Sequence, residues 1–356
     1  MKTRSITASL ALGCMAGGSA AHAQLTITPT FDSSITSLSD ASAIENSIDT
    51  DISRIESYIT TPNPDTITID FQNTTTGLGQ SLTPQADLDY STYLSDLEAN
   101  PTKNANQTTA LANMPAGPNT GINGATQVAL TAANLAAIGQ TALASSLVAG
   151  NGGFNSVISL NMGQLNDSRP DANSALYDLQ SVAAHEINEV LGIGGNGSTL
   201  YQPGATPPST LPTDVGPLDF FRYRAPGVKS FTYDPSAIAY FSINGGVTKL
   251  VNFNQQGANG SDFGDWGNAN VPQTQEGNTP PQVQDAFGTP GGMADVGANE
   301  LTALTVEGYN LTPEGLEVDG IASVPEPSTY GLVAGGALLL PFGSRAMRQL
   351  RKKFQA

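Results

Sequence analysis

The sequence predicts an α+β protein with a helix-rich amino-terminal half, to about residue 192, and an irregular, loop-rich carboxy-terminal half with β-structure over residues 193–320. Two observations support this prediction. Apolar residues recur at helical spacing over residues 41–59 and 174–191, whereas they alternate at strand spacing over residues 65–72. After residue 192 the chain is rich in glycine, proline and asparagine, and its apolar residues occur in short aromatic runs.

The amino-terminal half contains the more regular patterns. Its longest expected helix follows Asp40, ends before Pro62 and has one apolar side, formed by Ile44, Ile48, Ile52, Ile55 and Ile59. The other expected elements are a strand over residues 65–72, a helix over 90–97, a strand around 128–130, an alanine-rich helix from Thr131 to Ile138, a strand over 157–160 and a helix over 174–191. The polar segment after residue 72 and residues 101–125 are expected to be loops.

Fewer regular elements are expected in the carboxy-terminal half. Residues 239–246 combine an aromatic strand with an Asn-Gly pair, which predicts a β-hairpin. Residues 299–307 have the composition of a helix and precede Gly308.

The charge of the chain excludes one class of function. The 356 residues include 31 acidic and 14 basic side chains. Residues 24–323 contain 30 of the acids and only seven of the bases, which gives this part a formal charge near −23. Such a body repels polyanions, so we expect no binding of nucleic acid. The single cysteine, Cys14, excludes an intrachain disulfide.

The amino terminus has the features of a secretory signal. Lys2 and Arg4 precede an apolar run over residues 6–15, and Ala21-His22-Ala23 forms a small-x-small cleavage site before Gln24. Residues 1–23 are therefore predicted to be a signal peptide, and the mature protein to be exported. Cys14 follows Ala-Leu-Gly, which loosely resembles a lipoprotein cleavage box and leaves lipidation as an alternative.

The carboxy terminus has a second targeting pattern. Residues 324–329 contain Pro-Glu-Pro, residues 330–342 are apolar, and a basic cluster follows from Arg345. Together, residues 324–356 resemble the PEP-CTERM sorting signal of Gram-negative bacteria. The resemblance implies transient anchoring in the inner membrane, recognition by an exosortase, release to the cell surface or beyond, and a connection with exopolysaccharide. A plain tail anchor is the alternative.

The helix expected over residues 174–191 contains the clearest chemical motif. His185 and Glu189 are four residues apart and so share one face of the helix, with Glu186 beside them. The only other histidine, His22, lies in the predicted signal peptide. The order His-Glu-x-x-Glu resembles the His-Glu-x-x-His motif of zinc peptidases. This resemblance implies that His185 and Glu189 bind zinc and that Glu186 is the catalytic base.

A third zinc ligand must come from elsewhere in the chain. In metzincins a glycine three residues after the second ligand precedes a third ligand, and Gly192 has this spacing, but Gly195 stands at the ligand position and has no donor. The candidates are acidic residues of the carboxy-terminal half: Asp219, Asp262, Asp265 and Glu300. Asp265 is preferred because the loop over residues 260–266 is compact and rich in oxygen donors. Structural calcium, held by Asp262 and Asp265 near Asn268, is an alternative for this loop.

Several short motifs carry a family resemblance. From about residue 31 to residue 310 the chain resembles exported bacterial zincin-like metallopeptidases that often carry a PEP-CTERM tail. The matching pieces are Phe-Asp-Ser-Ser-Ile from Phe31, the His185 motif through Gly192, Phe221-Arg222-Tyr223, Tyr240 through Gly246, Gly264-Asp265-Trp266 and Gly308-Tyr309. The resemblance implies a zincin-like (metzincin-like) catalytic domain over residues 24–323 that hydrolyses peptide bonds in a protein or peptide substrate with zinc.

The same sequence features also allow a non-catalytic function. The scaffold can also belong to a surface or extracellular-matrix protein associated with exopolysaccharide. The missing second histidine favours this alternative, whereas Glu186 beside His185 favours the enzyme.

Overall fold

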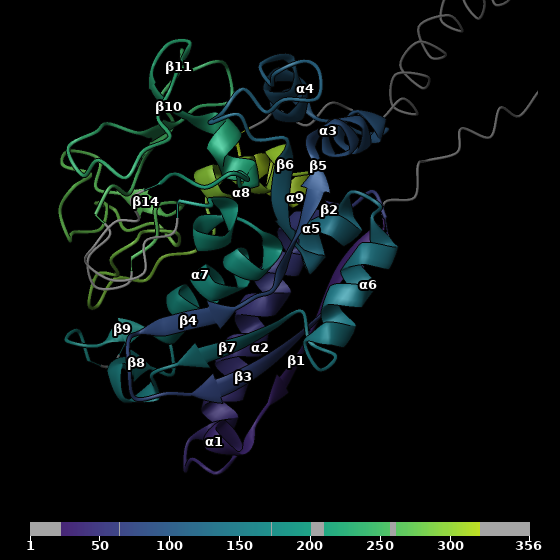
Figure 1. Cartoon of the computed structure of the whole chain (residues 1–356). Helices are drawn as coiled ribbons and strands as arrows, with labels where there is room; N and C mark the ends of the chain where they lie inside the picture. Colours follow the sequence, from purple (N-terminus) through teal and green to yellow (C-terminus); the bar gives the residue numbers. More distant parts are fainter. Residues whose placement is uncertain (1–22, 64, 172, 201–209, 257–260, 321–356) are drawn as a thin grey trace, which may run out of the picture. The chain divides into compact units, whose positions relative to one another are not determined.

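The larger of the two main sheets in the described residues contains both parallel and antiparallel strands, and the helix that carries His185 packs against it. The computed structural model describes residues 23–63, 65–171, 173–200, 210–256 and 261–320, which fall in one compact unit (Figure 1). The predicted signal peptide, apart from Ala23, and the predicted sorting tail lie outside the described residues. Among the helices of the described part, none is both long and apolar enough to cross a membrane.

The larger sheet has six strands in the order β15-β2-β1-β3-β7-β4. Its central strands β1, β3 and β7 are parallel, while β4 runs antiparallel to β7 and forms one edge (Figure 1). The strands are β1 Ala23–Phe31, β2 Ile59–Thr61, β3 Asp65–Asn73, β4 Gly79–Leu82, β7 Ser156–Leu160 and β15 Asn310–Leu311. The last strand brings the carboxy-terminal half back to the sheet of the amino-terminal half, so the two halves share one sheet.

One face of this sheet is apolar and lies in the core. Ile67, Ile69 and Phe71 alternate along β3 and are fully buried, whereas Thr66 is exposed. Helix α2 packs against β1, helix α7 packs against β7 and β4, and the two helices pack against each other. The isoleucines of α2 that the sequence places on one face are buried in the same core. The helices are α1 Ser33–Thr36, α2 Ala41–Tyr58, α3 Tyr90–Ala99, α4 Ala105–Ala112, α5 Ala132–Ala137, α6 Thr141–Gly150, α7 Leu179–Leu191, α8 Ala298–Val306 and α9 Pro313–Val318.

The carboxy-terminal half contains a second sheet of short strands. Its order is β11-β10-β12-β13-β14, and all its pairs are antiparallel. The strands are β10 Arg222–Ala225, β11 Val228–Lys229, β12 Tyr240–Phe241, β13 Val251–Phe253 and β14 Trp266–Gly267. Two small pairs are the other strands of the described residues: β5 Gln85–Asp89 with β6 Gln127–Thr131, and β8 Leu165–Asn166 with β9 Tyr177–Asp178. The described residues also include the 3-10 turns η1 Met162–Gln164, η2 Gly194–Gly197 and η3 Pro217–Phe221.

The structure confirms the α+β class and most of the expected elements. The helices α2, α3, α5, α7 and α8 and the strands β3, β6 and β7 are present where the sequence predicts them, within a few residues. The hairpin at residue 240 also forms, but its connection is longer than a two-residue turn, because β12 pairs with β13 across residues 242–250.

Three local predictions are wrong. Helix α7 begins at Leu179 rather than at residue 174, because the side chain of Asp178 accepts a hydrogen bond from the Ser181 backbone and caps the helix there. Residues 101–125 are not all loop: a capping box between Asn104 and Gln107 starts α4. The segment after residue 72, also expected to be loop, contains β4 and β5.

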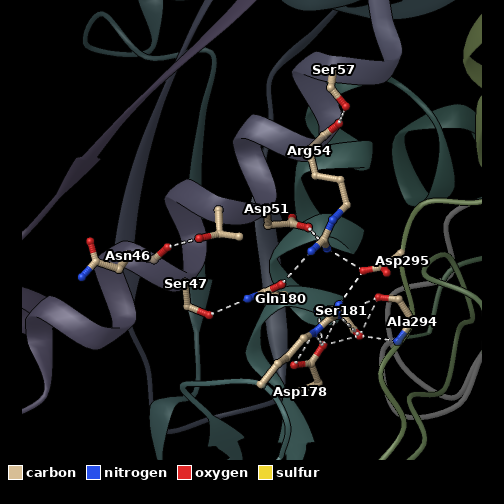
Figure 2. Close-up of polar contacts among 12 residues, drawn as sticks. Asn46, Ser47, Asp51, Arg54, Ser57, Asp178, Gln180, Ser181, Ala294 and Asp295 are labelled. Carbon is tan, nitrogen blue, oxygen red and sulfur yellow. Dashed lines mark hydrogen bonds and ion pairs between the residues drawn. The ribbon is translucent and has the colours of Figure 1, made fainter. Parts of the chain in front are cut away.

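Polar side chains connect α2 with the start of α7 (Figure 2). Figure 2 shows Arg54 of α2 pointing between Gln180 of α7 and Asp295, with hydrogen bonds to both. Asp51 lies one turn before Arg54, and its Oδ1 is 3.6 Å from Arg54 Nη1. Since Asp51 is 1% exposed and its Oδ2 has no hydrogen-bond partner among the described residues, it is an incompletely compensated acid in the core.

The buried Asp51 predicts a pH-dependent stability. Burial raises the pKa of Asp51 from 3.8 to about 8, although Arg54 and Arg169 act to lower it. The folded protein therefore keeps this proton when the unfolded chain has lost it, and stability falls as the pH rises from about 4 to about 8. Asp51→Asn should remove this loss, up to about 1.4 kcal/mol per pH unit, in urea unfolding measured at pH 5 and pH 8.

The matched control for this prediction is Asp49→Asn, at an exposed position of the same helix. An Asp51→Asn variant whose stability falls with pH as steeply as that of the parent protein would contradict the account of Asp51.

Candidate metal centre

Helix α7 has defined ends, which fix the direction of its side chains. The Asp178 carboxylate caps its first turn, and Gly192 ends it with a φ of 111°. A side chain at residue 192 would collide with Asn134, whose amide nitrogen donates to Leu191 O at 2.8 Å. The carbonyl of Leu191 also accepts a hydrogen bond from the hydroxyl of Tyr309. The carboxy-terminal end of the helix is therefore held by side chains of both halves.

Three side chains meet beside α7. His185 Nε2 lies 3.8 Å from Glu189 Oε1 and 3.7 Å from Asp265 Oδ1. All three donor atoms lie within 4.8 Å of one another, which is close enough to share one metal ion. His185 and Glu189 come from successive turns of α7, whereas Asp265 immediately precedes β14 of the second sheet.

A backbone carbonyl orients the histidine. His185 Nδ1 is 2.9 Å from Val283 O. Because a carbonyl oxygen can only accept, Nδ1 carries a proton, and in the neutral imidazole the lone pair of Nε2 faces Glu189 and Asp265. This is the arrangement usual for a metal-binding histidine, in which the second nitrogen is fixed by a hydrogen bond.

Both carboxylates of the group are also held in place. Ser81 of β4 donates to Glu189 Oε2 at 2.6 Å, and the backbone of Gly195 donates to Glu189 Oε1 at 3.0 Å. The amide nitrogen of Gln284 donates to Asp265 Oδ1 at 2.9 Å. Hydrogen bonds within the protein thus orient the side chains of His185, Glu189 and Asp265.

The predicted base lies next to this group. Glu186 is buried, and it lines the same cavity of about 1060 Å³ as His185, Glu189 and Asp265. Its carboxylate contacts Gly79 of β4 so closely that a side chain at residue 79 would overlap it. The position of Glu186 therefore depends on a glycine in the edge strand.

Two further glycines make room for polar side chains of the site. A side chain at Gly195 would lie 2.6 Å from Glu189 Oε1 and 2.8 Å from Asp262 Oδ2, and one at Gly194 would overlap Gln284. The sequence shows Gly195 where a metzincin would have its third ligand. The structure gives a physical reason for a glycine there, since carboxylates from other segments occupy the space.

The buried carboxyl groups raise one another's pKa. Burial raises the pKa of Glu186 well above its ordinary value, and Glu189 raises it further. The pKa values of Asp262 and Asp265 are also raised well above the ordinary value by burial and then by Glu189. Burial lowers the pKa of His185, but Glu186 and Glu189 outweigh this effect and raise it. A bound cation would relieve this repulsion, so the residues present suit a divalent metal.

The other candidates for a third ligand have different partners. Asp219 accepts hydrogen bonds from Ser198 Oγ and from the backbone of Gly216. Glu300 accepts from the Trp266 indole and caps α8. Asp262 lines the cavity, and its Oδ1 is buried without a hydrogen-bond partner in the part of the chain that the structure describes.

Of the three side chains considered for calcium, that of Asn268 is already hydrogen-bonded within the protein. The side-chain oxygen of Asn268 accepts from the backbone of Asn270 and Val271, and its nitrogen donates to Gly277 O. Asp265 instead faces the histidine.

Three residues of the site were not identified from the sequence: Ser81, Val283 and Gln284. Ser81 lies in a polar strand that the sequence gives no reason to assign as a strand. Gln284 is uncharged and lies 99 positions from His185, so no local motif connects the two.

No protein-family model, curated protein or solved structure matches the chain. The resemblance to zincin-like metallopeptidases and to a PEP-CTERM tail therefore stays a prediction, and function is inferred from the residues of this site.

Repulsion within the site predicts the effect of removing one charge. With a chelator present at pH 8, Asp265→Asn should raise the free energy of unfolding by on the order of 1 kcal/mol, because it removes one of several neighbouring acids and keeps an oxygen that can accept from Gln284. With zinc in excess the variant should instead be less stable than the parent protein, because it has lost a proposed zinc ligand. Urea unfolding under both conditions measures this change of sign, and stabilisation of equal size in both would contradict it.

Proposed function

We propose that the protein is an exported zinc-dependent metallopeptidase of zincin-like type, with His185, Glu189 and Asp265 as the zinc ligands and Glu186 as the catalytic base. The observation that carries this proposal is the meeting of three donor atoms within 4.8 Å of one another at a cavity that Glu186 also lines. Zinc at such a site supplies Lewis-acid chemistry that makes water nucleophilic near neutral pH.

Glu186 is suited to move protons in this reaction. It is buried beside the proposed ligands, and both its burial and the nearby Glu189 raise its pKa. A carboxylate with a raised pKa is a better base, and in its protonated form it can pass the proton to the leaving amine of a cleaved peptide. A cation held by the neighbouring ligands would lower the pKa of Glu186 and so favour its ionised form before the reaction.

The edge strand β4 offers a place for an extended peptide. It is the last strand of the six-stranded sheet, and its residues Gly79–Leu82 line the cavity along with His185 and Glu186. Figure 1 shows β4 running alongside α7. An edge strand has free backbone donors and acceptors, and an extended chain can pair with them. A peptide bound in this way would pass the proposed zinc ligands.

The proposed setting outside the cell rests on the sequence. The predicted signal peptide and the resemblance of residues 324–356 to a PEP-CTERM tail favour export, transient attachment to the inner membrane, processing by an exosortase and release to the cell surface or beyond. The matrix-protein alternative, associated with exopolysaccharide, shares this route and differs only in lacking catalysis.

Substitution of the proposed base tests the mechanism. Glu186→Gln should lower the cleavage of unfolded casein by about a hundredfold to ten thousandfold, because the amide cannot accept the proton. Zinc content should stay at the parent level, since Glu186 is not a proposed ligand. Undiminished cleavage by the variant would refute this role, and absence of cleavage by both proteins with zinc bound would favour the matrix protein.

The close contact between Gly79 and Glu186 gives a second test. Gly79→Ala should displace the carboxylate and lower kcat by about tenfold or more, because small displacements of catalytic groups have large effects on rate. Gly150→Ala is the matched control, since a side chain there meets nothing within 4 Å. Equal activity of the two variants would show that Glu186 does not need its observed position.

A further inference from the structure

The amide of Gln284 lies between two of the proposed ligands. Its Nε2 is 2.9 Å from Asp265 Oδ1 and 3.3 Å from His185 Nε2. The residue is fully buried. Gly194 leaves the space that this side chain occupies, since a side chain at residue 194 would overlap the amide. The polar end of Gln284 is therefore built into the site.

The backbone of Gln284 is fixed by the elements that form the site. Its backbone N–H donates to Glu300 Oε1 at 3.2 Å, and its backbone carbonyl accepts from the backbone N–H of Trp266 at 2.8 Å. Trp266 follows Asp265, and Val283, which precedes Gln284, orients His185. One short segment thus both orients the histidine and places an amide beside its free nitrogen.

The two ends of this amide are in unequal surroundings. Nε2 has the contacts described above, whereas Oε1 is buried and has no hydrogen-bond partner in the described part of the chain. A half-turn about the last side-chain bond exchanges the two ends with almost no change in shape. After that rotation the oxygen faces His185 Nε2 and Asp265 Oδ1, and a cation bound between these two atoms would attract it.

We propose that Gln284 is a fourth metal ligand, which binds through its side-chain oxygen to the cation held by His185, Glu189 and Asp265. This inference rests on the proposed metal site. Two carboxylates already balance a divalent charge, and Glu186 and Asp262 add further acids to the cavity. A neutral oxygen donor would add a fourth protein ligand without adding to this negative charge, and the water of the proposed hydrolysis would then take a fifth position.

A second role for Gln284 has to be distinguished from ligation. Its N–H bond to Asp265 can position that carboxylate without any contact with the metal. The substitutions Gln284→Leu and Gln284→Glu separate the two roles. Leucine removes both the oxygen donor and the N–H group, whereas glutamate retains an oxygen donor, removes the N–H group and adds a negative charge.

Zinc affinity, measured on the full chain by competition with a chromophoric chelator, is the test. Ligation predicts that Gln284→Leu weakens zinc binding at least about tenfold, while Gln284→Glu stays within about threefold of the parent or binds more tightly. With cobalt(II) as a probe, the visible absorption of the leucine variant should change in intensity, and that of the glutamate variant should not fall. Gln282→Leu, two residues earlier, is the control and should leave zinc affinity unchanged.

The outcomes separate this proposal from the proposed function. Parent-like zinc affinity in Gln284→Leu, or equal weakening in Gln284→Leu and Gln284→Glu, overturns ligation by Gln284 while the metallopeptidase proposal stands. If the parent protein itself fails to bind zinc, the proposed metal site fails and this inference fails with it. Should the leucine variant not fold, as judged by circular dichroism, the glutamate variant alone decides: retained affinity supports ligation and lost affinity overturns it.

Discussion

Mutual repulsion among buried carboxylates is the constraint on which the site depends. Glu186, Glu189, Asp262 and Asp265 lie around a single imidazole, and burial leaves their charges poorly screened. Such a cluster opposes folding unless protons or a cation reduce its charge. The hydrogen bonds to Glu189 and the glycines beside the acids hold this group together. The protein maintains this unfavourable concentration of charge at a cavity, which is typical of a functional site rather than of a core.

The fold brings the group together from both halves of the chain. Helix α7 and strand β4 supply His185, the glutamates and the edge of the cavity, whereas the second sheet and the segment after it supply Asp265, Val283 and Gln284. Neither half contains the whole site. The return of the chain through β15 to the first sheet therefore has a functional consequence, because it ties the segments that carry these side chains to one framework.

Local patterns in the sequence predict the main helices and strands, but not the tertiary contacts that complete the site. The isoleucine stripe of α2 and the alternation in β3 are strong enough to define those elements, and the spacing of His185 and Glu189 predicts their common face. The sequence does not predict strand β4, because its Gly-Gln-Ser-Leu segment has no strand pattern and its place is set by pairing with β7. Asp265 could be preferred on the composition of its loop, but Gln284 could not, since only the tertiary fold brings a neutral amide to the histidine.

The metal content of residues 24–323, purified without chelator or added metal, tests the central claim most directly. The account predicts about one zinc ion per chain by elemental analysis, and loss of that zinc in His185→Ala. The absence of zinc, calcium alone, or an equal zinc content in His185→Ala would contradict it, and the acidic cluster would then need an explanation other than metal binding.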